Sequence, residues 1–87
     1  MLDEDAKFLR EVLFSVLPNI VYPDELREIV EREVDHNESI KAFAEDFKKM
    51  IDSETDMTRK TDKRIFLNEM RRMAKHRYGE EEVAKWF

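Results

Sequence analysis

The sequence predicts an all-α fold, a compact bundle of four main helices plus a short C-terminal helix, formed by a single domain over residues 1–87. Apolar residues recur at intervals of three and four along most of the chain, which is the spacing of a buried helix face. The chain has one glycine and two prolines, and each stands where a helix is expected to begin or end. Apolar residues make up 41% of the chain and include six Phe and five Met, so one core can form although 43% of the residues are charged.

The first helix is expected from Asp3 to Leu17. Its buried face is predicted to consist of Leu2, Ala6, Leu9, Val12, Leu13 and Val16. Asp3 is the predicted N-cap, and Pro18 ends the segment because it disfavours helical geometry at Leu17. Residues 18–22 are apolar for a loop, so we expect them to cross the core. Residues 20–22 resemble a strand, but no other segment offers a strand to pair with.

The second helix is expected to begin at Pro23, whose missing N–H is harmless at the first helical position. The third helix is expected over about residues 36–52, because Asp35 and Glu38 have the spacing of a capping box. The predicted core residues of these two helices are Leu26, Val30, Val34, Ile40, Phe43, Ala44, Phe47, Met50 and Ile51.

The fourth helix is expected to follow a polar linker over residues 53–61 and to run to about Tyr78. Thr58 or Thr61 is its predicted N-cap, and Gly79 is placed to end it in a left-handed conformation. Its predicted buried face consists of Phe66, Leu67, Met70, Met73 and Ala74. A short last helix is expected over residues 80–87.

Several classes of protein are disfavoured by composition. The absence of cysteine leaves no disulfide or thiolate metal site, which favours an intracellular location. No apolar run approaches the roughly 18–20 residues that span a bilayer, and the first residues are acidic rather than basic. We therefore expect a soluble, cytoplasmic protein with no membrane contact.

Catalytic and cofactor-binding patterns are also missing from the sequence. His36 and His76 lie outside any metal-ligand spacing, and a single glycine cannot form a phosphate-binding loop. No serine or threonine stands in a strand–turn–helix elbow. The sequence therefore predicts no enzyme, no cofactor, no metal and no small-molecule substrate.

One acidic segment resembles a calcium loop, because Asp52, Glu54 and Asp56 alternate along the chain. The sixth position of such a loop should be glycine and is Met57, and the twelfth should be glutamate and is Lys63. We interpret the segment as a solvated linker.

The fourth helix carries a basic stripe on an otherwise acidic chain. Residues 1–56 have a net charge of −9, whereas residues 57–87 have +4. At 100° per residue one side of the helix gathers Lys60, Arg64, Asn68, Arg71, Arg72 and Lys75, with Arg59 and Lys63 nearby. The stripe is interpreted in three ways: a solvated face, a site for nucleic acid, or a site for an acidic protein partner.

Four large apolar side chains are candidates for contact with a protein partner. Phe14 and Ile65 lie outside the predicted apolar faces of their helices, and Trp86 and Phe87 end the chain. Each has a structural alternative: Phe14 and Ile65 as core residues covered from a second side, and the terminal aromatics as anchors of the last helix.

These observations predict a small, non-enzymatic protein-interaction or regulatory module that acts through its surface, with a protein partner or a second copy of the chain. The alternative is a nucleic-acid-binding protein that uses the basic fourth helix, at about residues 59–77.

Overall fold

The computed structural model describes residues 1–87 and confirms the predicted all-α architecture. Its elements are α1 (Asp3–Val16), a 3-10 helix η1 (Leu17–Asn19), α2 (Pro23–His36), α3 (Ile40–Ser53), α4 (Met57–Tyr78) and α5 (Glu80–Ala84). The four main helices and the short terminal helix therefore occur in the predicted order. No helix is long and apolar enough to cross a membrane.

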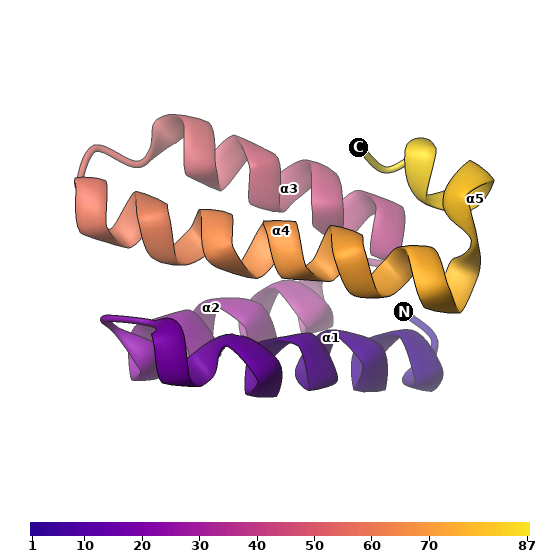
Figure 1. Ribbon diagram of the computed structural model, residues 1–87, viewed down its shortest axis with the longest axis horizontal. Coiled ribbons are helices and arrows are strands. Elements are labelled where there is room, and N and C mark those ends of the chain that lie inside the picture. Colours follow the sequence, from indigo (N-terminus) through magenta and orange to yellow (C-terminus); the bar gives the residue numbers. More distant parts are fainter.

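The longest helix, α4, lies at the centre of the bundle and contacts three of the other helices. It lies between α3 and α1, with α2 further from the viewer and α5 folded back at the C-terminal end of α4 (Figure 1). It contacts α1, α3 and α5, while α2 packs against α1 and α3. The molecule measures 32 × 23 × 22 Å, so one long helix spans most of its length.

A cluster of phenylalanine rings forms the centre of the core between α3 and α4. The ring centroids of Phe43 and Phe47 are 5.5 Å apart, and Phe66 lies 6.0 Å from the first and 5.0 Å from the second. All three side chains are fully buried. Such pairs contribute about 0.5–1.5 kcal/mol beyond the burial of their area. The 3.6-residue periodicity therefore identified the centres of the buried faces of α3 and α4, whereas Met50, Leu67 and Met73 at their edges are half-buried.

The N-terminal caps of α3 and α4 differ from the prediction. Ser39 accepts a hydrogen bond from the backbone N–H of Ala42 at 3.1 Å, and Asp56 accepts one from that of Arg59 at 2.8 Å. The predicted capping box beginning at Asp35 is wrong, because α2 continues through that residue to His36. Asp35 therefore lies inside α2 and cannot serve as the N-cap of α3.

Three other predicted caps are also wrong. Asp3 is the first residue of α1, and Leu2 occupies the N-cap position without a side-chain hydrogen bond. Thr58 and Thr61 lie inside α4, where the hydroxyl of Thr61 donates to the carbonyl of Met57 at 2.9 Å. α1 therefore begins at its predicted cap, and α4 begins one residue before Thr58 and four before Thr61.

The chain ends in a short element that is fixed to the bundle by aromatic contacts. Gly79 has φ 88° and ψ 152°, and its positive φ agrees with the predicted use of a glycine there. α5 then returns along the bundle, ends at Ala84, and leaves Trp86 3% exposed. The indole packs edge-to-face on Tyr78 at 5.0 Å, and the Tyr78 hydroxyl donates to Asp5 at 2.6 Å. Burial and this hydrogen bond raise the pKa of Tyr78 well above its ordinary value.

Candidate macromolecule-binding face of α4

The predicted basic stripe lies on the surface of the bundle: Asn68 borders a groove shared with the end of α1, and Arg71 and Lys75 border a hollow shared with Glu80 and Val83 of α5. Arg64, Asn68, Arg71 and Lys75 are exposed and Lys60 is half-buried. We call these five residues the α4 stripe. They follow one another at intervals of four, four, three and four residues, so they stay on one side of the helix over about 22 Å.

The cations of the α4 stripe have no acidic partners. None of the eight ion pairs in the structure involves Lys60, Arg64, Arg71 or Lys75. Their side chains donate no hydrogen bond within the protein either. Water is therefore their main polar partner, apart from the contact of Arg71 with an aromatic ring described below.

Arg72 differs from the other predicted members of the basic stripe. It is exposed but pairs with Glu69 one turn earlier, and Glu69 also accepts a hydrogen bond from Ser15 of α1 at 3.1 Å. The hydrogen bond from Arg72 lowers the pKa of Glu69 below its ordinary value. Arg72 therefore belongs to the contact between α4 and α1 and is not part of the free stripe.

The acidic residues of α4 are too few and too engaged to neutralise the α4 stripe. The helix carries eight Lys/Arg and two Asp/Glu, a net charge of +6, whereas the other 65 residues have a net charge of −11. Besides Glu69, the only acid of α4 is Asp62, which is 4% exposed. Its carboxylate accepts the backbone N–H groups of Val21 and Tyr22 at 3.0 and 2.9 Å.

The C-terminal aromatics lie beside the α4 stripe, and one of them is not available to a partner. Trp86 is buried, which corrects its prediction as a surface contact and confirms its alternative role as an anchor of the last helix. Phe87 is half-buried between two cations: Lys48 lies 5.5 Å and Arg71 5.8 Å from its ring centroid. Lys48 also donates to the carbonyl of Trp86 at 2.7 Å.

The other two apolar candidates lie on different parts of the surface. Ile65 is half-buried and lines an open groove of about 360 Å³ between the end of α1 and α4, together with Val16 and Asn68. Phe14 is 79% exposed on α1 and does not line this groove. The prediction that Phe14 belongs to the core through a second covered side is therefore wrong, whereas Ile65 packs partly against the core.

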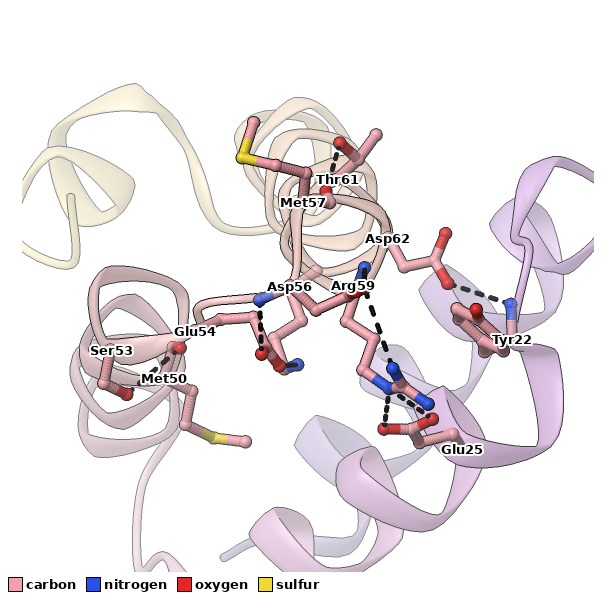
Figure 2. A network of polar contacts seen from close by, with 11 residues as sticks. Tyr22, Glu25, Met50, Ser53, Glu54, Asp56, Met57, Arg59, Thr61 and Asp62 are labelled. Atoms are coloured by element: carbon pink, nitrogen blue, oxygen red, sulfur yellow. Dashed lines mark hydrogen bonds and ion pairs between the residues drawn. The ribbon is translucent and has the colours of Figure 1, made fainter.

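A polar network that the sequence does not predict lies where α2 and α4 begin and α3 ends (Figure 2). Arg59 forms two hydrogen bonds with Glu25, at 2.9 and 3.0 Å, and its guanidinium lies 4.4 Å from the ring centroid of Tyr22. The hydrogen bonds that Arg59 donates to the Glu25 carboxylate raise the pKa of Arg59. Figure 2 shows Asp62 directed at the backbone of Tyr22 beside this pair, so the network ties the start of α2 to α4.

The structure also corrects the predicted position of Lys63. It was predicted to add charge near the basic stripe, but it is 5% exposed and its ammonium donates to Glu54 at 2.7 Å. Lys63 precedes Phe66 by three and Met70 by seven residues, so the core-face periodicity of α4 includes it. That spacing was the signal that could have revealed its burial. The acidic segment before α4, interpreted as a solvated linker, thus supplies the partner of a buried cation.

The largest hollows in the surface are open and shallow. One of about 390 Å³ lies between α2 and the end of α3, and Glu28, Met50 and Lys63 are among the residues that line it. No group of three His, Asp or Glu side chains is placed to hold a metal ion. His36 and His76 are both exposed.

A family model matches residues 6–75, which covers most of the chain from α1 into α4. The chain belongs to the MJ1579 family. The part shared with the MJ1579 family contains the whole α4 stripe and the polar network of Figure 2, whereas α5, Trp86 and Phe87 lie beyond it. No curated protein and no solved structure matches the chain.

Proposed function

We propose that this member of the MJ1579 family is a small non-enzymatic interaction module that binds an acidic macromolecule through the α4 stripe. The observation that carries the proposal is that Lys60, Arg64, Arg71 and Lys75 are aligned on one side of α4 and that none of them forms an ion pair. The protein meanwhile has 21 Asp/Glu residues with which these cations could have been neutralised.

An acidic partner would supply the interaction that the bundle itself does not. Isolated surface charges contribute little to the stability of a fold, so the α4 stripe is of small value to the folded chain alone. A cluster of like charges instead attracts a surface of opposite charge and accelerates encounter, up to about 10⁸–10⁹ M⁻¹s⁻¹ at low salt. The separation of +6 on α4 from −11 elsewhere orients the molecule as it approaches.

The four apolar candidates give less support to a contact with a protein partner than the α4 stripe gives to contact with an acidic one. Trp86 is part of the core, and Ile65 and Phe87 are half-buried. Partner surfaces usually rely on a group of apolar anchors at their centre. Phe14 is the one large apolar candidate that is fully available.

A test separates the α4 stripe from the net charge of the protein. The double variant Arg64→Gln/Lys75→Gln removes two cations of the stripe, and Lys41→Gln/Lys49→Gln removes two exposed cations of α3. Both variants change the net charge from −5 to −7. Retention on heparin resin is measured at about 50 mM salt, where screening is weak.

We expect the wild type and the α3 variant to be retained alike, and the α4 variant to elute at lower salt. Equal loss in both variants would show that bulk charge governs binding. Absence of wild-type retention would contradict the proposed function.

The exposure of Phe14 favours a second candidate function, contact with another protein molecule of the same kind through α1. Sedimentation of the wild type at increasing concentration tests it. A dimer that is lost in Phe14→Ser would support this candidate, and a monomer at all concentrations would rule it out.

A further inference from the structure

We infer that the acidic partner is double-stranded DNA, contacted by the α4 stripe through phosphates on both sides of the major groove. This inference rests on the proposed function and names the partner. It depends on the spacing of the cations, on the side chains that the α4 stripe lacks, and on the position of the acidic residues.

The four cations form two pairs rather than a continuous row. Lys60 and Arg64 are one turn apart, Arg71 and Lys75 are one turn apart, and Asn68 lies between the pairs. The centres of the pairs are separated by eleven residues, or about 16 Å along the helix axis. The major groove of B-form DNA is about 12 Å wide, so flexible Lys and Arg side chains from the two pairs can reach the phosphates that border it.

The composition of the α4 stripe disfavours the other acidic macromolecules. Single strands are bound mainly by stacking bases on exposed aromatic rings; the stripe contains none, and Phe87 beside it is half-buried with Lys48 and Arg71 against its ring. Protein interfaces are centred on apolar or aromatic anchors, and its five residues are four cations and one amide. The major groove of duplex RNA is deep and narrow, which does not match the separation of the two pairs.

The acidic residues would limit how the protein approaches DNA. α2 carries six Asp/Glu and two Arg, and it lies behind the layer of α1 and α4 in Figure 1. The electrostatic field would therefore repel the duplex from this side and attract it to α4. A protein with an overall charge of −5 can bind a polyanion in this way only through a defined face.

The experiment measures fluorescence anisotropy of a labelled random-sequence DNA duplex of about two helical turns, titrated with the full chain at several salt concentrations. Four phosphate contacts predict a slope of about −3.6 for log affinity against log salt, which is a loss of about 150-fold between 50 and 200 mM salt. Arg64→Gln/Lys75→Gln should lower the slope to about −1.8 and the loss to about twelvefold. Lys41→Gln/Lys49→Gln should keep the wild-type slope. Far-UV circular dichroism establishes that each variant is folded.

The remaining arms use single-stranded DNA and duplex RNA of equal length. Tighter binding to duplex DNA, lost in the α4 variant alone, supports the inference. If heparin is retained through the α4 stripe but duplex DNA binds no more tightly than the single strand or duplex RNA, the inference fails and the proposed function stands. If heparin is not retained either, both fail.

Discussion

Removal of the Asp62 carboxylate tests how the start of α2 is attached to α4. In Asp62→Ala the backbone N–H groups of Val21 and Tyr22 lose their acceptor, at 3.0 and 2.9 Å. Hydrogen bonds to a charged group contribute about 1.5–3 kcal/mol each. Water can replace part of this loss because Val21 is 62% exposed, and alanine returns about 0.5 kcal/mol of helix propensity. We therefore expect the free energy of unfolding to fall by about 2–4 kcal/mol. The total for a domain of this size is about 4–13 kcal/mol.

Thermal unfolding followed by circular dichroism measures this loss. A cost of 2–4 kcal/mol lowers the Tm of a domain of this size by about 10–25 °C. Asp52→Ala is the matched control, because Asp52 is exposed and has no hydrogen-bond partner in the protein. A Tm for Asp62→Ala within about 2 °C of the control would refute the reasoning, since that carboxylate would then not hold the connection.

Three further predictions concern other parts of the fold. Gly79→Ala should lower the free energy of unfolding by about 1–3 kcal/mol, because φ 88° and ψ 152° strain any other residue. The added Cβ itself meets no atom within 4 Å, so the cost comes from the backbone alone. Urea unfolding measures this loss. The ammonium of Lys63 and a backbone N–H hold the pKa of Glu54 below its ordinary value, so its contribution to stability is present above about pH 4.5 and disappears as the pH falls through the folded-state pKa. Glu54→Gln should therefore show a smaller loss of unfolding free energy on acidification than the wild type. Trp86→Ala should cost about 3–5 kcal/mol and Phe14→Ser less than about 0.5 kcal/mol by urea unfolding, because the first side chain is 3% and the second 79% exposed.

Each of these predictions has an outcome that contradicts it. An unchanged midpoint in Gly79→Ala would mean that the turn before α5 relaxes without cost. Glu45→Gln removes an exposed, unpaired carboxylate, so its acid profile should follow the wild type. Coincident profiles for Glu45→Gln and Glu54→Gln would show that the pair with Lys63 is not the source. Equal losses of unfolding free energy in Phe14→Ser and Trp86→Ala would contradict the assignment of Trp86 to the core and Phe14 to the surface.

The order and burial of the helices were predictable because periodicity is a local property. Phe47 and Met70 are fully buried, as their spacing predicts. The helix ends were less predictable, because several neighbouring side chains can cap the same helix. Asp35 and Ser39 are both competent caps, and the choice depends on how far α2 extends.

The candidate site was only half predictable for a related reason. The alignment of the α4 stripe follows from numbering alone, and the exposure of Arg64 and Lys75 agrees with it. The pairing of Arg72 and the burial of Lys63 depend on side chains contributed by other segments, Glu69 held by Ser15 and Glu54 before α4. Spacing along one helix carries no information about these partners.

The contact between α1 and α4 delays folding during synthesis. α1 precedes α4 by some forty residues, yet its hydrogen bonds to α4 join residues 54 and 73 positions apart, Ser15 to Glu69 and Tyr78 to Asp5. At about 5–20 residues per second, α1 waits roughly 3–12 s after its own translation before α4 is complete. The part of its apolar side that packs against α4 has no partner during that interval, although α2 can cover the rest, so a nascent chain stalled before α4 exposes apolar surface that favours aggregation or capture by a chaperone.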